Sequence, residues 1–364
     1  MKHYDVAIVG AGIAGASLAA AIAPFVSVVL LEAEDVAGYH ATGRSAAFWS
    51  ETYGGPGIQP LTTASGPALR AGGFLQDLGS LHIGRAEDAP AIEAFLAEFA
   101  GSGVALDRVD PHALVPGLRP EWTLGVLEAS STYIDVAALH AHYLAQAKRA
   151  GATLLVSAPL QSAERRNDCW EVQTGGGPVS APILVNAAGA WADQVAGRAG
   201  VAPIGITAYR RTVVQLATDP AAPDTLPHIA DISGSFYFKP EAGGRLWLSP
   251  HDETEALPGD AQPEELDVAI AIDRFEHVVD WTITRVERRW AGLRSFAPDR
   301  LPVYGFAAES PGFFWFAGQG GFGIQTAPAA AALAAALLLG REPDPSVAGI
   351  DPARYAPGRF VAVA

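Results

Sequence analysis

The sequence has one cysteine, Cys169, and few basic residues among its 364 positions. An internal disulfide is therefore impossible, and a metal site built from several cysteines is excluded. Lysine and arginine number 24 against 39 acidic residues, which gives a formal charge of −15, and no basic cluster is longer than Arg210-Arg211 or Arg288-Arg289. A chain of this charge is not expected to bind nucleic acid or an anionic membrane surface.

Long hydrophobic runs are also missing. The most apolar late segment, residues 327–340, is alanine-rich and too short to span about 30 Å of hydrocarbon as a helix. Only Lys2 and His3 precede the first predicted strand, without the apolar stretch or cleavage site of a signal peptide. His140 and His142 are two residues apart and would point to different sides of a helix, so they predict no metal site. We therefore expect a soluble, cytoplasmic protein without a transmembrane segment.

The first 32 residues contain the pattern of a dinucleotide-binding βαβ unit. They predict a strand, a helix and a second strand, at residues 5–10, 13–23 and 26–31. Gly10, Gly12 and Gly15 have the GxGxxG spacing, in which glycines allow a tight turn, approach of a pyrophosphate and close helix–strand packing. The phosphates would lie at the positive N-terminus of the helix, and Glu32 would accept a hydrogen bond from a ribose hydroxyl. The unit therefore predicts binding of FAD or NAD.

Residues 35–47 follow this unit and are rich in small and hydroxyl side chains. Thr42, Arg44 and Ser45 offer donors for phosphate or flavin oxygens. The same residues could equally form a simple helix-capping turn. Their place directly after a dinucleotide unit favours a role in cofactor binding.

A second glycine-rich turn lies near the end of the chain, at residues 317–326, between a predicted buried strand and an alanine-rich helix. A simple nicotinamide dehydrogenase has no need of this turn. A longer dinucleotide whose isoalloxazine ring lies near the helix does, because the helix dipole would stabilise negative charge at the flavin N1–C2=O group on reduction. The two turns together favour FAD over NAD.

At 364 residues the chain exceeds the usual size of one domain. We predict an α/β, Rossmann-like FAD-binding domain that is discontinuous in sequence, made of residues 1–80, 136–200 and 291–364. We predict an α+β substrate-binding domain with a mixed, largely antiparallel sheet from residues 81–135 and 201–290. We further expect a loop at residues 54–67, together with helices at 89–99, 135–150 and 263–279 and strands at 153–157, 170–174, 183–185, 206–217, 236–239, 245–249 and 313–316.

Six runs at similar spacing from end to end carry a resemblance: GAGIAGAS, GYHATGRSAAF, VNAAGAW, FYFKP, WAGLRSF and FFWFAGQGGFGIQT. They resemble the superfamily of FAD-dependent D-amino-acid oxidases, glycine oxidases and sarcosine oxidases. More narrowly, the sequence is similar to the bacterial D-arginine dehydrogenase group of FAD-dependent D-amino-acid dehydrogenases. Together the runs are specific for the superfamily and less so for the narrower group.

The resemblance implies noncovalent FAD, and Cys169 lies in a strand context far from the expected site, which argues against a cysteine-linked flavin. The residues that it implies for cofactor binding are Gly10, Gly12, Ile13, Ala14, Gly15, Glu32, Thr42, Gly43, Arg44, Ser45, Ala46, Ala47, Leu160, Ala188, Gly189, Trp191, Gly292, Gly320, Gly321, Phe322, Gly323, Ile324, Gln325 and Thr326.

The resemblance also implies a substrate site. Its catalytic candidates are Tyr53, Arg211, Tyr237 and Arg294, and its further substrate-binding candidates are Phe48, Gln319 and Gly320. Arg294 is the expected clamp, since an arginine fork fits a carboxylate in two parallel hydrogen bonds. Gly320 would offer its carbonyl to the amino group. From the residues alone Arg210 is as good a candidate as Arg211, and the two tyrosines could simply be core residues.

Two departures from the D-arginine dehydrogenase pattern bear on specificity. Phe48 stands where those enzymes have a histidine that contacts substrate, and phenylalanine cannot share a proton. Near Ile83 they have a glutamate that pairs with a basic side chain, whereas the nearest carboxylates here are Glu87 and Asp88. An apolar or neutral D-amino acid therefore fits better, given Phe48, Trp49 and Ile83. An acidic substrate held by His82 or Arg85 is the weaker alternative.

We therefore predict an enzyme that oxidises D-amino acids to 2-oxo acids and ammonia by hydride transfer from Cα to flavin N5, with oxygen or a quinone as electron acceptor. No general base is evident; Tyr53 or a water is the candidate proton acceptor. The alternatives are oxidation of a secondary amine of the sarcosine or proline type, oxidation of a 2-hydroxy acid, and a role as the flavoprotein subunit of a larger electron-transfer complex. A nicotinamide-dependent dehydrogenase would leave the second glycine turn unexplained.

Overall fold

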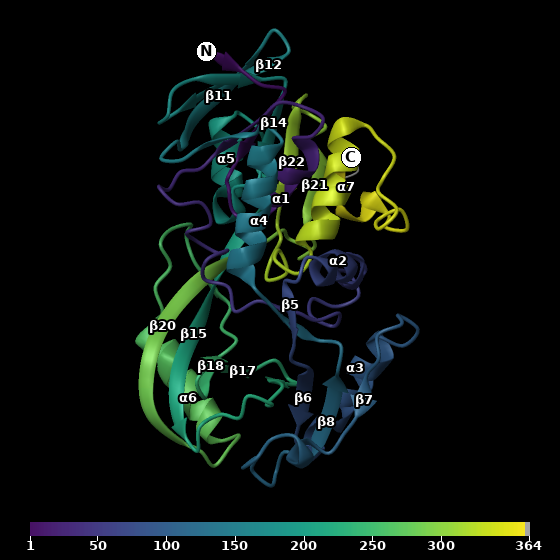
Figure 1. The fold of residues 1–364 in the computed structure, drawn as a ribbon, viewed down its shortest axis with the longest axis vertical. Helices are drawn as coiled ribbons and strands as arrows, with labels where there is room; N and C mark the ends of the chain where they lie inside the picture. The colour runs from purple at the N-terminus through teal and green to yellow at the C-terminus, as the bar shows by residue number, and fades with distance from the viewer. Residues whose placement is uncertain (361–364) are drawn as a thin grey trace.

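A six-stranded sheet forms the core of the upper lobe in Figure 1, which shows the computed structural model; it describes residues 1–360. The strand order is β10-β3-β2-β14-β22-β21, and all neighbours are parallel except β21 and β22. The strands are β2 (Val6–Val9), β3 (Val28–Leu31), β10 (Thr153–Leu155), β14 (Ile183–Asn186), β21 (Val303–Phe306) and β22 (Phe313–Ala317).

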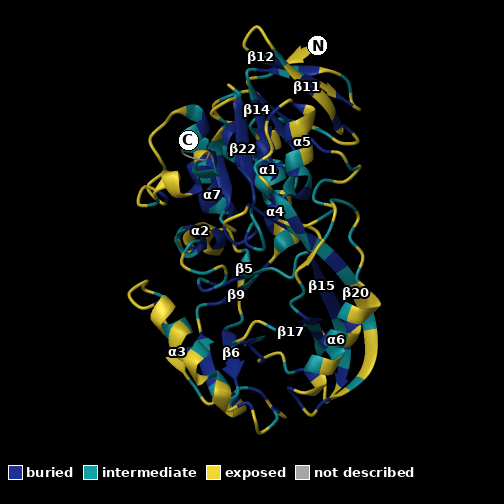
Figure 2. Cartoon of the chain, turned by 180° about the vertical axis from the view of Figure 1, so that it is seen from behind, coloured by how far each residue is buried: buried dark blue, intermediate teal, exposed yellow. Residues whose placement is uncertain are grey.

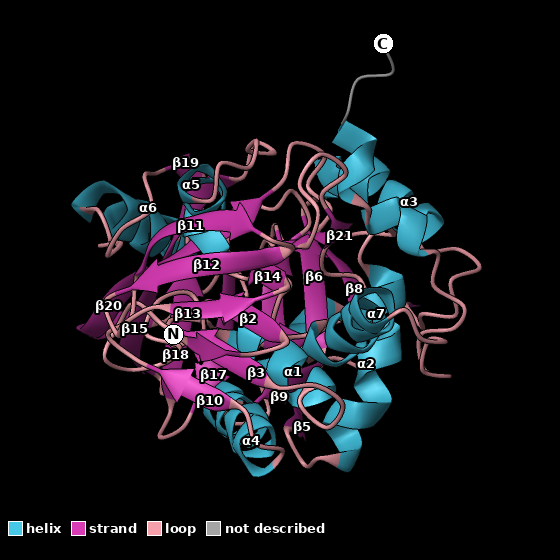
Figure 3. Cartoon of the chain, turned by 90° about the horizontal axis from the view of Figure 1, so that it is seen from above, coloured by secondary structure: helices cyan, strands magenta, loops and turns pink. Residues whose placement is uncertain are grey.

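Both faces of this sheet are covered, so its strands are apolar throughout. Val6 and Ile8 face one hydrophobic cluster with Leu18 of the first helix, while Ala7 and Val9 face a second cluster on the opposite side. The first face carries α1 (Ile13–Ile22), α2 (Gln59–Ala71), α4 (Val136–Arg149) and α7 (Ala327–Leu339). The second carries α5 (Ala192–Arg198) and a four-stranded sheet, β1 (Lys2–His3), β11 (Leu160–Arg166), β12 (Cys169–Thr174) and β13 (Val179–Ala181) (Figure 3).

A nine-stranded, mostly antiparallel sheet forms the lower lobe (Figure 1). Its order is β19-β15-β18-β17-β16-β6-β8-β7, and β20 pairs with β15 along its whole length. The strands are β6 (Ser80–Gly84), β7 (Asp107–Arg108), β8 (Leu124–Glu128), β15 (Thr207–Asp219), β16 (His228–Asp231), β17 (Tyr237–Glu241), β18 (Arg245–Ser249), β19 (Thr254–Glu255) and β20 (Thr282–Phe296).

The alternation of side chains along these strands separates core from site. Phe238, Leu246 and Leu248 pack against Phe275 of α6 (Glu265–Glu276) in a third hydrophobic cluster. Tyr237 therefore points to the other face, toward the upper lobe. Figure 2 shows buried strands β14 and β22 in the upper lobe and exposed outer surfaces on β20 and α3 (Ala89–Glu98).

A small sheet of β4 (Phe48–Trp49), β9 (Thr132–Ile134) and β5 (Leu75–Asp77) lies between the two larger sheets. Short 3-10 turns complete the chain, at Ala86–Asp88, Pro111–Ala113, Gly189–Trp191, Pro352–Tyr355 and Pro357–Phe360. No helix among residues 1–360 combines the length and the apolar character needed to cross a bilayer.

The predicted fold class is confirmed, including the expected opening βαβ unit and the helices at α3, α4 and α6. The loop predicted at residues 54–67 was wrong, because α2 begins at Gln59. Its Pro60 occupies the first turn, where a missing N–H costs nothing. A side chain at Gly66 would bring its Cβ within 2.8 Å of the Trp49 ring, so this glycine reflects close packing and not a break.

The division into two domains stays a prediction, but two of its boundaries fall inside strands. The boundary between residues 80 and 81 divides β6, and that between 290 and 291 divides β20. Gly292 and Arg294 therefore belong to the lower sheet, where they pair with Arg211 and Tyr209 of β15. Residues 361–364 of the predicted FAD-binding segment lie outside the described residues.

A pH dependence of stability follows from His82 in β6. Its Nε2 is buried without a hydrogen-bond partner among the described residues, its ring lies 4.5 Å from that of Phe95, and burial lowers its pKa to about 4. A histidine in the unfolded chain has a pKa near 6.5. Between pH 6.5 and pH 4 the unfolded state therefore binds a proton at this residue that the folded state does not bind. The free energy of unfolding consequently decreases as the pH falls through this range.

We expect His82→Leu to reduce the loss of unfolding free energy between pH 7 and pH 4.5 by about 2 kcal/mol, measured by urea unfolding. His277→Leu is the control, because the His277 side chain is 66% exposed. An unchanged pH dependence in the His82 variant would contradict the burial of a neutral imidazole.

Candidate functional site

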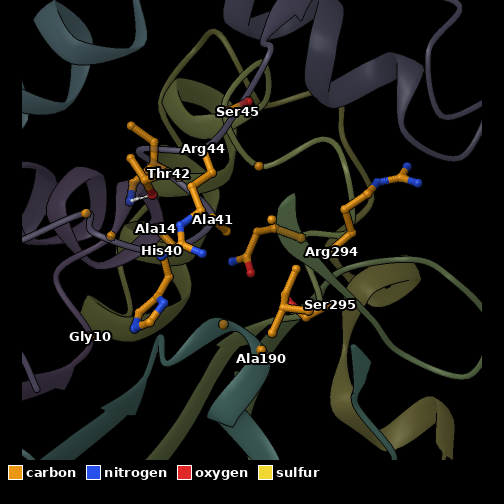
Figure 4. Close-up of a pocket in the computed structure, with 18 of the residues that line it drawn as sticks. Gly10, Ala14, His40, Ala41, Thr42, Arg44, Ser45, Ala190, Arg294 and Ser295 are labelled. Carbon is orange, nitrogen blue, oxygen red and sulfur yellow. Dashed lines mark hydrogen bonds between the residues drawn. The ribbon is translucent and has the colours of Figure 1, made fainter. Parts of the chain in front are cut away.

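A single long pocket runs from the N-terminus of α1 to the lower sheet, between the two lobes (Figure 4). Gly10, Gly12 and Glu32 line one end, and Arg211 and Arg294 line the other. The pocket therefore joins the predicted cofactor residues to the predicted substrate residues.

The glycines of the first turn are packed against backbone atoms. Gly10 has a φ of +99°, and a Cβ there would lie 2.5 Å from the Ala187 carbonyl oxygen. A Cβ on Gly15 would lie 1.9 Å from the Gly10 carbonyl oxygen. Backbone cannot move aside as a side chain can, so both positions require glycine. The turn thus holds the N-terminus of α1 open toward the pocket, as a site for phosphate requires.

Glu32 is buried at the end of β3 and lines the same part of the pocket. Its Oε2 accepts a hydrogen bond from the Ala11 amide at 3.0 Å, and its Oε1 accepts one from the Glu34 amide at 3.1 Å. These bonds fix the carboxylate while leaving lone pairs for a ribose hydroxyl. Thr42 Oγ1 accepts from the Ile13 amide at 3.0 Å, so its hydroxyl secures the turn.

His40 and Trp191 form an aromatic pair at this end, with ring centroids 4.5 Å apart. His40 Nε2 lies 2.8 Å from Glu34 Oε1, and all three residues line the pocket. His40 was not among the predicted cofactor residues. The only signal for it was its position inside the GYHATGRS run.

The Arg44 side chain, predicted as a donor to the cofactor, also has partners within the protein. Its guanidinium pairs with Asp260 and donates to the carbonyl oxygens of Ala261 at 2.9 Å and Ala291 at 3.3 Å. Arg44 lines the pocket, but its side chain ties the segment after β3 to the lower sheet. The sequence could not reveal this, because all three partners lie more than 200 residues away.

At the other end the structure brings Phe48, Tyr53, Arg211, Tyr237 and Arg294 together around the pocket. The Tyr53 hydroxyl accepts from Arg294 Nη2 at 2.9 Å. The Phe48 ring lies 5.0 Å from that of Tyr53 and 6.5 Å from that of Tyr237. Burial raises the pKa of Tyr237, so its phenol stays protonated and able to donate.

Of the two adjacent arginines, Arg211 is the one on the pocket. Arg210 points to the other face of β15, where its Nη2 lies 2.8 Å from Asp267 of α6. Arg211 is 7% exposed and donates through Nε to the Asp252 carbonyl oxygen at 2.8 Å. Burial and the neighbouring Arg294 lower the pKa of Arg211.

The second glycine turn lies directly against these residues. A Cβ on Gly321 would be 2.3 Å from Arg294 Nη2 and 2.6 Å from the Tyr53 hydroxyl oxygen. Gln325 donates to the Tyr53 carbonyl oxygen at 3.0 Å and accepts from the Ser50 amide at 3.3 Å. The turn therefore positions the segment that carries Phe48 and Tyr53.

Glu128 of β8 holds the same segment from below and was not predicted. It is fully buried, and its carboxylate accepts from the Ser50 hydroxyl at 2.8 Å, the Glu51 amide at 2.6 Å and the Thr52 hydroxyl at 2.6 Å. Burial raises its pKa, while these hydrogen bonds oppose the rise. In the sequence, the one sign of this role is a glutamate at the end of an otherwise apolar strand.

Most of the predicted site residues line the pocket, but some do not. Gly15, Gly43, Phe322 and Thr326 are absent from its wall. Gly15 and Gly43 pack beneath it, and Phe322 packs its ring on Tyr53 at 5.1 Å. Neither Trp49 nor Ile83 shapes the pocket, since both lie in hydrophobic clusters. Cys169 opens β12, and no cysteine lines the described pocket.

The chain belongs to the FAD dependent oxidoreductase family, whose model matches residues 5–337. FAD is accordingly its cofactor, and the residues present fit this group, since Gly10 and Gly12 line the pocket at the N-terminus of α1 and Glu32 is fixed beside the turn. The narrower resemblance to D-arginine dehydrogenases stays a prediction.

Among curated proteins, the chain is 26% identical to human mitochondrial dimethylglycine dehydrogenase over 396 residues, covering 96% of this chain and 44% of that protein. It is 29% identical to glycine oxidase of Pseudomonas aeruginosa over 190 residues, covering 51% of this chain and 48% of that protein. The chain thus spans less than half the length of the dimethylglycine dehydrogenases that it matches.

Solved structures show the same fold at lower identity. L-proline dehydrogenase from P. horikoshii has a TM-score of 0.85 at 22% identity, with 99% of this chain and 98% of that chain covered. Glycine oxidase from Geobacillus kaustophilus has a TM-score of 0.84 at 22% identity, with 98% of each chain covered.

We predict that Gly15→Ala raises the dissociation constant for FAD at least about tenfold, because the added Cβ must displace the Gly10 backbone. Titration of the apoprotein with FAD, followed by flavin fluorescence, measures it. The control is Gly197→Ala in α5, where an added Cβ meets no atom within 4 Å. Equal affinities in the two variants would contradict the packing described.

We predict that Glu128→Ala lowers the free energy of unfolding by about 1.5–3 kcal/mol, because it leaves buried donors at residues 50–52 without their acceptor. Urea unfolding at pH 7 measures the loss. Glu121→Ala, an exposed glutamate of the same lobe, is the control. A loss no larger than the control's would show that Glu128 does not hold this segment.

Proposed function

We propose that the protein oxidises the carbon–nitrogen bond of a small amine that carries a carboxylate. The predicted substrate is a D-amino acid with an apolar or neutral side chain, and the products are a 2-oxo acid and ammonia. Bound FAD, proposed to be noncovalent, supplies the two-electron acceptor for such an oxidation. The chain's own residues bind, orient and enclose the substrate.

The observation that carries this proposal is the convergence of Arg294 and Tyr53 on the second glycine turn, with Arg211 lining the same pocket. The Arg294 side chain is 11% exposed and that of Arg211 is 8% exposed, so each charge is largely desolvated. A substrate carboxylate would accept charge-assisted hydrogen bonds from them. Such a contact would fix the position of the substrate α-carbon. The bound substrate would then lose little further orientational freedom on reaching the transition state.

Aromatic rings would enclose the rest of the substrate. Phe48 packs between Tyr53 and His228, whose ring lies 4.4 Å away, and Tyr237 closes the same wall. Tyr237 would donate its protonated hydroxyl, and the Gly320 carbonyl would accept from the amino group. Tyr53 accepts from Arg294 and keeps its own hydrogen free to donate.

The charges on the pocket wall favour a neutral substrate side chain. The acidic residues that line the pocket, Glu32 and Glu34, lie at the cofactor end. A basic side chain would therefore find no carboxylate on the wall of the substrate end. Neither His82 nor Arg85 lines this pocket, so the wall offers no support for a second substrate carboxylate from these two residues.

A secondary or tertiary amine is the second candidate. The relatives named dimethylglycine dehydrogenase and L-proline dehydrogenase favour it. Both kinds of substrate carry a carboxylate, so the arginines would serve either. Oxygen or a quinone is the proposed electron acceptor, and a cytoplasmic location stays a prediction. A 2-hydroxy acid as substrate, and electron transfer within a larger complex, also stay open.

The substrate class is tested by mixing FAD-loaded protein anaerobically with D-amino acids, L-amino acids, sarcosine, dimethylglycine, proline and lactate. We expect bleaching of the flavin absorbance fastest with D-amino acids whose side chains are apolar or neutral. Faster bleaching by the N-methylated amines or proline would establish the second candidate. Absence of bleaching with every amine would contradict the proposal.

Arg294→Gln tests the carboxylate contact. Loss of a desolvated, charge-assisted interaction should cost about 2–5 kcal/mol of transition-state stabilisation, seen as a lower kcat/KM. Arg288→Gln on the same strand is the control, since Arg288 is exposed and makes no ion pair among the described residues. Equal kcat/KM values in the two variants would remove Arg294 from the substrate site.

A further inference from the structure

Glu253 lies in the loop between β18 and β19, where three guanidiniums converge on its carboxylate. Arg294 Nη1 lies 2.5 Å from Oε1, and Arg211 Nη2 lies 3.4 Å from the same oxygen. Arg300 Nη2 donates to both oxygens at 2.9 Å. Two of these arginines are the proposed substrate arginines, so Glu253 is bound directly to the carboxylate site.

The charges around Glu253 do not balance. Burial opposes ionisation of Glu253, but Arg294, Arg300 and Arg211 hold its pKa below the usual value, so it is a carboxylate. The other carboxylate near these arginines is Asp252, which lies 3.9 Å from Arg211 Nε and is shared with Arg210, whose Nε lies 3.8 Å away. Three guanidiniums thus meet on the single carboxylate of Glu253. At this point positive groups outnumber negative ones, which suits one further carboxylate.

Glu253 also determines which edge of Arg294 stays free. Nη1 is bound to Glu253, Nη2 donates to Tyr53, and Nε is buried without a partner among residues 1–360. Nε and Nη2 form one of the two edges through which a guanidinium binds a carboxylate in parallel bonds. This edge faces Gly321, where a Cβ would lie 2.5 Å from Nε. With Glu253 on Nη1, the unpaired Nε of Arg294 therefore lies on the side of the glycine turn.

We propose that Glu253 is a positioning and specificity-determining residue: it orients Arg294 for one substrate carboxylate and excludes substrates with a second negative charge nearby. The inference rests on the proposed function, because it assumes that a carboxylate binds at Arg294. A purely structural ion pair would stabilise the loop without affecting which anions bind.

The test uses acetate and malonate as probes, because the two differ by one carboxylate. FAD-loaded protein is titrated with each, and the change in flavin absorbance gives the two dissociation constants without turnover. We expect the wild-type protein to bind malonate at least about tenfold more weakly than acetate, because the second carboxylate would lie close to the negative charge of Glu253. Glu253→Gln should reduce this malonate-to-acetate ratio at least about tenfold.

Three further variants make the result specific. Glu253→Asp keeps the charge and should retain most of the wild-type ratio. Arg300→Gln should raise the ratio, because it removes positive charge beside Glu253 from a side chain that is 48% exposed and therefore tolerant of change. Glu255→Gln, a nearby exposed residue of β19, should leave both constants unchanged.

The possible failures are distinguishable. An unchanged ratio in both Glu253→Gln and Arg300→Gln, with FAD retained, would overturn the role of Glu253 and leave the proposed function intact. Absence of any absorbance change with either anion in the wild-type protein would overturn both. If Glu253→Gln does not retain FAD, Arg300→Gln alone tests the proposal. A raised malonate-to-acetate ratio in that variant supports the role of Glu253, and an unchanged or lowered ratio overturns it.

Discussion

The close approach of Gly321 to Arg294 and Tyr53 is the contact on which the site depends. Gly321 belongs to the turn that follows β22 of the upper sheet, and Arg294 belongs to β20 of the lower sheet. A Cβ at Gly321 would lie 2.3 Å from the guanidinium, so a larger residue would displace the Arg294 and Tyr53 side chains. Without this contact, the second glycine turn and the two arginines proposed to bind substrate would line separate surfaces and not one pocket.

Several buried polar side chains keep that contact in place from the surrounding segments. Glu128 and Gln325 hold the chain that carries Tyr53 from opposite sides, through a carboxylate below and an amide above. Arg44 fastens the segment after β3 to the edge of the lower sheet. Each is largely buried, so removing one partner would leave the other group desolvated and unpaired, which costs more than the bond itself contributes.

Elements whose conformation follows from neighbouring residues could be predicted from the sequence. Elements and side-chain roles that depend on residues far away in the chain could not. The βαβ unit and the glycine turn at residues 317–326 could be predicted because their spacing directly reflects local backbone geometry. The helix at Gln59–Ala71 could not, because its Gly66 is explained by close packing on Trp49, a contact that the local sequence does not reveal. The first half of the strand Thr282–Phe296, residues 282–289, is mostly exposed and rich in charge, and its pairing with β15 defines it. Glu128 and Glu253 gain their roles from partners up to 78 residues away.

A structure of the FAD-loaded protein with a bound monocarboxylate such as acetate tests the central claim most directly. The account predicts acetate in the pocket between Arg211 and Arg294, with its oxygens within hydrogen-bonding distance of the Nε and Nη2 atoms of Arg294 and with Glu253 still on Nη1. Acetate bound away from both arginines, with the Arg294 Nε and Nη2 edge turned from the pocket, would contradict the account.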